Sequence, residues 1–223
     1  MPRKNRYNGK SVPYFPLFVN LAGRFCLLVG GGAVAARKAQ ALIDFGASLT
    51  VVDPEPSENI RSLERQGLLG IRERAYGGTG EISGAALVVA ATNDRELNQR
   101  IARDAEAAGI PVNVSDAPDL CSFFFPALVR RGELVAGIST SGACPRLTAR
   151  LRQQLDRCWP SGLGEALEQL KEERRRIRES SDPAETIQRL DVLITGLLEE
   201  MEKTGGSSNK ISVEHNEENN LDP

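Results

Sequence analysis

A glycine-rich turn is the first stretch of this 223-residue chain whose residue types and spacing suit a defined chemistry. The run Gly30-Gly31-Gly32-Ala33-Val34-Ala35 fits the pattern G-x-G-x-x-A, and Asp53 follows at about the 20-residue distance that the pattern requires. In this pattern the first glycine permits a tight turn, the second lets the backbone approach a pyrophosphate, and the alanine allows close helix–strand packing. The acid bonds the hydroxyl groups of an adenosine ribose. The stretch therefore predicts a dinucleotide site, whose cofactor-binding residues are Gly30, Gly31, Gly32, Ala33, Val34 and Asp53.

The segments around the turn are those that a dinucleotide fold needs. Residues 25–29 form an apolar run typical of a buried strand, residues 34–45 have helical periodicity ending near Gly46, and residues 49–52 form a second apolar run. This context distinguishes the turn from a glycine loop that serves only to reverse the chain. The negative charge of Asp53 would repel a 2′-phosphate, so the sequence favours NAD over NADP.

Strand-like and helical segments continue to alternate up to residue 114. They are expected at residues 57–66, 69–75, 86–91, 95–108 and 110–114. This alternation predicts an α/β fold of the Rossmann type, with a doubly wound parallel sheet. Ligands of such sheets bind beyond the carboxyl ends of the strands. Thr92, Asn93 and Asn113 fall at those ends, and we expect them to contact the cofactor as well.

Asp116 is the best acid–base candidate in the chain, because it follows the last strand of the predicted sheet. It would therefore face the nicotinamide end of a bound cofactor. The alternative is an Asx turn or a cap before Pro118. The single histidine, His215, lies in a polar C-terminal stretch, so in an enzyme a carboxylate must handle protons.

A hydroxyl-rich loop precedes a predicted helix that begins at Pro145 and runs through Cys158. Backbone N–H groups in such a loop, together with arginines on successive helical turns, can seat a carboxylate. The alternative is simple helix capping with solvated arginines. The residues concerned are Ser139, Thr140, Ser141, Gly142, Arg146 and Arg150.

The remaining segments predict a small α+β region followed by helices. Two strands are expected at residues 121–125 and 134–139, and two further helices at 163–179 and 183–203. The last helix carries an apolar stripe, interpreted as core, and a capping-box pattern of Asp182 with Glu185. The members of the stripe are Leu190, Leu193, Leu197 and Met201.

Composition excludes several classes of function. The formal net charge of −2 argues against nucleic-acid binding, and no apolar run is long enough for a membrane span. The basic N-terminal residues precede no hydrophobic signal core, so a cytoplasmic protein is expected. The four cysteines form no C-x-x-C pair, and a metal site held by the protein is not expected.

These stretches together resemble the family of precorrin-2 dehydrogenases, some members of which are also sirohydrochlorin ferrochelatases. The resemblance covers about residues 14–160 and rests on the segments Tyr14–Phe18, Val29–Lys38, Ala90–Asp94, Asn113–Pro118, Ser122-Phe123 with Pro126, and Ser139–Gly142 with Pro145. It implies a Rossmann domain at 14–115, a middle dimerisation and substrate domain at 116–160, and a helical domain at 161–203. Residues 1–13 are expected to be flexible and residues 204–223 disordered. A homodimer is implied as well.

The resemblance also implies the reaction. NAD takes a hydride from precorrin-2, which becomes the tetrapyrrole sirohydrochlorin of siroheme biosynthesis, and Asp116 matches the family's general base. In bifunctional members Fe²⁺ is a substrate that is inserted into the macrocycle, so no protein-held metal is needed. The many carboxylates of the tetrapyrrole suit the hydroxyl-rich loop with Arg146 and Arg150, and Arg130 and Arg131 are further candidates. The rival hypothesis is a non-catalytic NAD-sensing module, which needs Asp53 but not Asp116.

Overall fold

The computed structural model describes residues 6–7, 10–179 and 183–205. The chain divides into two compact units, Met1–Phe125 and Pro126–Pro223. The boundary lies ten residues after the one expected from the sequence, because the intervening segment is hydrogen-bonded back to the sheet of the first unit. Among the described residues, no helix is long and apolar enough to span a membrane.

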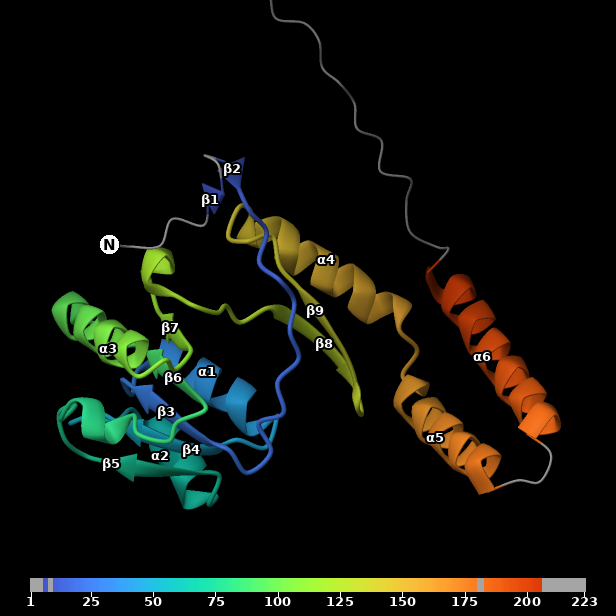
Figure 1. The fold of residues 1–223 in the computed structure, drawn as a ribbon, viewed down its shortest axis with the longest axis horizontal. Helices are drawn as coiled ribbons and strands as arrows, with labels where there is room; N and C mark the ends of the chain where they lie inside the picture. Colours follow the sequence, from blue (N-terminus) through green and yellow to red (C-terminus); the bar gives the residue numbers. More distant parts are fainter. Residues whose placement is uncertain (1–5, 8–9, 180–182, 206–223) are drawn as a thin grey trace, which may run out of the picture. The chain divides into compact units, whose positions relative to one another are not determined.

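A five-stranded parallel sheet forms the centre of the first unit (Figure 1). In spatial order its strands are β5 (Leu69–Arg72), β4 (Ser48–Val52), β3 (Phe25–Val29), β6 (Leu87–Ala90) and β7 (Val112–Val114). Val29 pairs with both Val52 and Ala90, and Ala90 pairs with Val114, so four strands end level with one another. This topology confirms the predicted Rossmann-type fold.

Helices cover both faces of the sheet. One buried cluster joins the sheet to α1 (Ala33–Ile43) and α2 (Glu58–Arg65), and the other joins it to α3 (Arg95–Ala107). Because both faces are covered, the strands are apolar along their whole length, and every residue of β6 is buried. On α1 the buried residues Ala35, Ala39 and Leu42 recur at helical spacing, so α1 packs through small side chains close to the strands.

The strand expected at residues 121–125 is absent, and this prediction is wrong. The segment follows the short helix η2 (Pro118–Leu120) and is bonded to the edge of the sheet by side chains. The Ser122 N–H donates to Val112 O at 2.8 Å, and the Ser122 hydroxyl oxygen accepts from Val112 N at 2.7 Å. The Asn113 amide donates to Phe123 O at 3.0 Å. These bonds satisfy backbone groups that a ladder would otherwise pair.

The second unit contains a hairpin and three helices. They are β8 (Ala127–Arg131), β9 (Leu134–Ile138), α4 (Pro145–Cys158), α5 (Leu163–Glu179) and α6 (Pro183–Gly205). The bounds of α4 and α5 are those predicted. The hairpin turns at Gly132, whose φ of 58° suits glycine. Arg131 donates to Asp156 Oδ1 at 3.0 Å and to Asp156 O at 2.8 Å, which fastens β8 to α4 and occupies this candidate substrate ligand.

The apolar stripe on α6 is not a buried core in this chain. Leu190 and Leu197 are half-buried, and Leu193 is 37% exposed. The side chain of Met201 and the proposed capping box of Asp182 with Glu185 lie outside the described residues. Residues 206–223, for which disorder was predicted, lie outside them as well.

Before the sheet, the chain makes a two-residue ladder and then an extended segment. The ladder pairs β1 (Arg6–Tyr7) with β2 (Lys10–Ser11), within the stretch expected to be flexible. Residues 12–20 have no regular structure, and Phe15 is 85% exposed. The Tyr14 ring meets Phe124 edge-on at 4.6 Å.

Tyr76 links the loop after β5 to α3 and gives the fold a testable dependence on alkaline pH. Its ring is buried, and its hydroxyl donates to Asp104 Oδ2 at 3.0 Å. Burial, followed by the bond to Asp104, raises the pKa of Tyr76 well above the ordinary value of 10.0. The unfolded chain therefore loses this proton first as the pH rises, so the stabilisation is complete below about pH 10 and is lost above it.

We expect Tyr76→Phe to lower the free energy of unfolding by about 1–2 kcal/mol at neutral pH, because it removes a hydrogen bond to a carboxylate. The same substitution should make the decline in stability above about pH 10 less steep, since the titrating group is gone. Urea denaturation of both proteins across the alkaline range measures these effects. An equally steep alkaline decline in the variant would contradict this account.

Candidate functional site

The turn after β3 is fixed by the close approach of Gly30 to the neighbouring strand. Gly30 has a φ of 111°, and a side-chain carbon added there would lie 2.6 Å from the carbonyl carbon of Ala91. Its N–H donates to Val52 O at 3.0 Å, while Ala91 N donates to Val29 O at 2.8 Å. Only glycine fits this position, so the turn is locked between the ends of β4 and β6.

Asp53 lies directly beside the turn. Its Oδ2 accepts from Gly31 N at 2.7 Å, and its Oδ1 accepts from Glu55 N at 2.7 Å. Side-chain carbon at Gly31 would come within 2.8 Å of Pro56 Cα and 3.1 Å of the Asp53 side chain, so glycine is needed here too. The carboxylate is thus oriented by backbone N–H groups, with lone pairs left over for the hydroxyls of a ribose.

Gly32 differs from its two neighbours because the space beside it is open. Gly32 is the N-cap residue of α1, with a φ of −80°, and no side chain caps the helix there. No atom beyond its chain neighbours lies within 4 Å of the position that a side-chain carbon would take. Ala33 and Val34 are exposed in the first turn of the helix, and Ala35 behind them is buried. An uncapped helix N-terminus with open space in front suits a pyrophosphate. The residues present therefore fit a dinucleotide.

The loop after β6 is held by a buried asparagine that the sequence reasoning missed. Asn98 Oδ1 accepts from the Thr92 hydroxyl at 2.7 Å, and its amide donates to Thr92 O at 3.0 Å. Asp94 caps α3 by accepting from Glu96 N and Leu97 N. Asn93 between them is exposed at the end of the sheet. The available signal was a polar residue at a buried register position of an amphipathic helix.

Asn113, which was predicted to contact the cofactor, is buried at the end of the sheet and bonded within the protein. It is 4% exposed, and its amide group bonds within the protein: Oδ1 accepts from Lys38, while Nδ2 donates to Phe123 O and, at 3.6 Å, to Cys121 Sγ. Direct contact between this amide and a cofactor would break these bonds. Lys38 itself was not among the candidate residues.

Asp116 stands at the carboxyl end of the sheet in an unusual conformation. The preceding residue, Ser115, extends the pairing of β7 by donating to Ala90 O at 2.8 Å. Asp116 then has a φ of 62° and is exposed, and among the described residues its carboxylate makes no hydrogen bond or ion pair. The cap of η2 is Ala117, without a side-chain bond, so the capping alternative does not describe Asp116. A carboxylate held in a sparsely populated backbone region is typical of functional sites.

The predicted substrate loop belongs to the second unit, and two of its hydroxyls serve the loop itself. Thr140 Oγ1 accepts from Cys144 N at 3.2 Å and lies 2.9 Å from Thr148 Oγ1, while Ser139 Oγ accepts from Ser141 N. Ser141 has a φ of 52° and is followed by Gly142. The Thr140 hydroxyl is thus bonded next to the start of α4, whose N-cap residue Cys144 makes no side-chain cap hydrogen bond.

The two arginines that follow this loop have the opposite character. Arg146 and Arg150 are exposed on α4, and neither has an ion-pair partner among the described residues. Both guanidinium groups remain available to anions.

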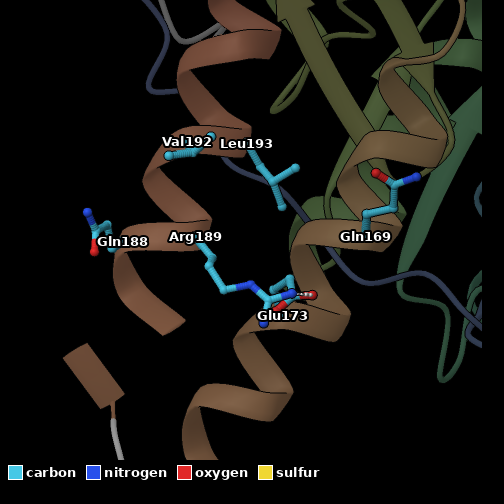
Figure 2. A pocket seen from close by; sticks show the side chains of 6 residues that line it. All are labelled: Gln169, Glu173, Gln188, Arg189, Val192 and Leu193. Atoms are coloured by element: carbon cyan, nitrogen blue, oxygen red, sulfur yellow. Dashed lines mark ion pairs between the residues drawn. The ribbon is translucent and has the colours of Figure 1, made fainter. Parts of the chain in front are cut away.

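A separate hollow of about 600 Å³ lies between α5 and α6 (Figure 2). Arg189 reaches across it to Glu173 at 4.0 Å, and Val192 and Leu193 are among its lining residues. The described residues include no group of three His, Cys, Asp or Glu side chains that could hold a metal ion. The hollow is lined by side chains of two packed helices and is not a candidate for the functional site.

Comparison with known proteins shows which proteins the chain is similar to. Residues 17–127 match the family model described as "Putative NAD(P)-binding". A siroheme synthase from Pseudomonas paraeruginosa is 45% identical over 166 residues, which are 74% of this chain and 36% of that protein. Over these residues the chain is similar to siroheme synthases. One from Methylococcus capsulatus is 40% identical over 167 residues, 75% of this chain and 35% of that protein.

The chain also matches a solved structure. The protein named "SirC, precorrin-2 dehydrogenase" is 27% identical and aligns with a TM-score of 0.66, covering 85% of this chain and all of that one. The chain spans about a third of the length of the siroheme synthases that it matches. The residues that match the family model include the dinucleotide turn and the sheet that positions it.

The two glycines of the turn should respond differently to the same substitution. Gly30→Ala forces a side chain against the end of β6 and strains a positive φ, so we expect a loss of about 2–4 kcal/mol of stability. Gly32→Ala meets no atom and should leave the free energy of unfolding within about 0.5 kcal/mol of the original. Its methyl group enters the space for the pyrophosphate, so the affinity for NAD⁺ should fall about tenfold or more. Thermal unfolding and calorimetric titration with NAD⁺ measure the two effects. Unchanged NAD⁺ affinity in Gly32→Ala would place the pyrophosphate elsewhere.

Proposed function

We propose that this protein is an NAD-dependent dehydrogenase that oxidises precorrin-2 to sirohydrochlorin. The proposal rests chiefly on Asp116, an exposed carboxylate without a bond among the described residues, held at a positive φ at the same end of the sheet as the dinucleotide turn. The similarity to siroheme synthases and to a precorrin-2 dehydrogenase supports the choice of substrate. Asp53 supports NAD over NADP, because a 2′-phosphate would meet a carboxylate that is already fixed.

The reaction removes two electrons and two hydrogens from the macrocycle. When bound, NAD⁺ accepts one hydrogen with both electrons, as hydride at C4 of the nicotinamide. The other hydrogen leaves as a proton, and in our proposal a carboxylate oxygen of Asp116 takes it. The Asp116 carboxylate is exposed and makes no hydrogen bond among the described residues. It can therefore contact the substrate without first losing a hydrogen bond.

We propose that the loop Ser139–Gly142 and helix α4 of the second unit bind the substrate. Precorrin-2 carries many carboxylates, and the exposed guanidinium groups of Arg146 and Arg150 suit them. The backbone N–H group of Gly142 completes the proposed seat, while Ser139 and Thr140 shape the loop by accepting from Ser141 N and Cys144 N. Arg131 is excluded from this role because it is bonded to Asp156.

Iron insertion is a separate question that the same assay answers. The macrocycle nitrogens are the final ligands of the metal. An enzyme that inserts the metal therefore needs a group that accepts the protons of these nitrogens more than it needs protein ligands for the metal. Purified protein is given precorrin-2 and NAD⁺ without oxygen, then Fe²⁺, while absorbance is followed. Insertion faster than the spontaneous rate would add a ferrochelatase activity to the proposed dehydrogenase.

We propose the cytoplasm as the compartment of this NAD-dependent reaction.

Replacement of Asp116 tests the function against the rival NAD-sensing module. We expect Asp116→Ala and Asp116→Asn to reduce sirohydrochlorin formation by about 100-fold or more, because neither side chain can accept the proton. The dissociation constant for NAD⁺ should stay within about twofold, because Asp116 is not part of the dinucleotide turn. Full turnover by both variants would remove Asp116 from the mechanism. Absence of sirohydrochlorin with the unsubstituted protein, despite tight NAD⁺ binding, would favour the sensing module.

We also propose that the protein is a homodimer that associates through its second unit. On α4, Leu147 is 47% exposed and Leu151, one helical turn later, is 36% exposed. Adjacent apolar side chains on an exposed helix face are typical of an interface. The family resemblance implies a middle domain that interlocks two subunits, and α4 lies within it.

Leu147→Glu should shift the protein from dimer to monomer, because it places a charge on the apolar face of α4. Ala149→Glu is the matched control: this exposed residue lies two positions along the helix and points to another side. Sedimentation velocity at several concentrations gives the association state of each. A monomeric unsubstituted protein, or equal effects of both substitutions, would rule out this interface.

A further inference from the structure

Lys38 is the one charged residue of α1 that reaches from the helix to the edge strand of the sheet. It lies between the buried residues Ala35 and Ala39 and is itself half-buried. Its ammonium donates a hydrogen bond to Asn113 Oδ1 on β7, 75 positions further along the chain. A lysine at such a position usually extends into solvent. Here its charged end is turned inward.

Three parts of the site meet at this ammonium. The Phe125 ring lies beneath it, with Lys38 Nζ 4.8 Å from the ring centroid. Asn113, which accepts the bond from Lys38, donates in turn to Phe123 O at 3.0 Å. Lys38 therefore connects α1, whose first turn faces the proposed pyrophosphate, with β7, which leads to Asp116, and with the segment at 121–125. Contacts of this kind fix the spacing between the two ends of a site.

The charge of Lys38 is set among identifiable groups. Burial lowers its pKa from the ordinary value of 10.5. Cys121 and Asp116 act in the opposite direction and favour the charged form, while Arg37 disfavours it. Within the described part of the chain, Asn113 Oδ1 is the acceptor of its hydrogen bond, and Phe125 adds a cation–π contact. Even partial burial of a cation costs stability, so the half-buried position of Lys38 points to a role other than stabilising the fold.

We propose that Lys38 is a positioning residue for the dehydrogenation: it fixes the end of β7 relative to α1 and keeps a positive charge facing Asp116. This inference rests on the proposed function. The cation favours the ionised carboxylate that must accept the proton, and the bond to Asn113 holds the carboxylate at a constant distance from the bound nicotinamide. Misplacement of a reacting group by about 1 Å can cost 100-fold in rate.

Substitution of Lys38 separates this role from cofactor binding. Lys38→Met keeps the length of the side chain but loses the charge and the hydrogen bond, so kcat should fall by about 10- to 100-fold. The dissociation constant for NAD⁺ should change by less than about twofold. Lys38→Arg should restore most of kcat, because it keeps the charge. Arg37→Met is the matched control: it removes the same charge from the adjacent, exposed position and should leave kcat within about twofold. Lys38→Met with kcat within about twofold of the original would overturn the proposal.

The pH profile distinguishes a charge effect from a packing effect. The pKa of Lys38 is lowered from 10.5, so its ammonium loses the proton at a lower pH than an ordinary lysine does. The kcat should therefore fall as the pH rises through this lowered pKa. Arginine stays charged throughout, so Lys38→Arg should retain its kcat over this range. Identical alkaline limbs for the two proteins would rule out a role for the charge.

A measurement without turnover tests the pairing with Asp116 on its own. Titration of the Lys38 side chain by NMR, in protein with isotope-labelled lysine, should give a lower pKa in Asp116→Asn than in the original, because a favourable negative charge has been removed. Lys38→Arg identifies the resonance. An unchanged Lys38 pKa would overturn the proposed pairing. If the unsubstituted protein does not oxidise precorrin-2 but this shift is seen, the proposed function has failed while the pairing stands.

Discussion

The contact between Gly30 and the end of β6 is the constraint on which the rest of the site depends. Backbone at the turn passes so close to Ala91 that no side chain fits between them. This contact brings the end of β3 level with the ends of its neighbours, where Asp53, Thr92 and Asp116 follow. A parallel sheet with helices on both faces supplies such an edge by its topology. Because Gly30 has no side chain, the backbone can turn tightly at the end of β3, and α1 begins three residues later.

Much of the fold could be predicted because its signals are local. The apolar runs, the helical periodicity and the glycines that end the helices indicated the order of the sheet elements, and the bounds of α4 and α5 were obtained from the sequence. The glycine turn with Asp53 was recognisable because its function requires a fixed spacing along the chain. Asp116 was predicted as an acid–base residue from its position after a strand, and its backbone conformation had no signal in the sequence.

What could not be predicted depends on contacts between distant residues. Segment 121–125 is apolar enough for a strand, yet the hydroxyl of Ser122 and the amide of Asn113 bond it to β7 in another way. Asn113 was predicted to contact the cofactor because it falls at the carboxyl end of a strand, and its bonds to Lys38 and Phe123 had no signal in the sequence. Lys38 was not among the residues predicted for the site. Which of two strand faces a side chain takes depends on packing that no single-sequence pattern records.

The left-handed backbone at Asp116 implies that stability and activity oppose each other at this position. For a residue with a side chain, this conformation costs about 1 kcal/mol relative to glycine. Glycine would relieve that cost and, at the same time, remove the carboxylate. A search for more stable variants of the protein would therefore favour replacing the one residue on which the proposed proton transfer depends. Thermostability alone is an unsafe criterion for selecting variants of this protein.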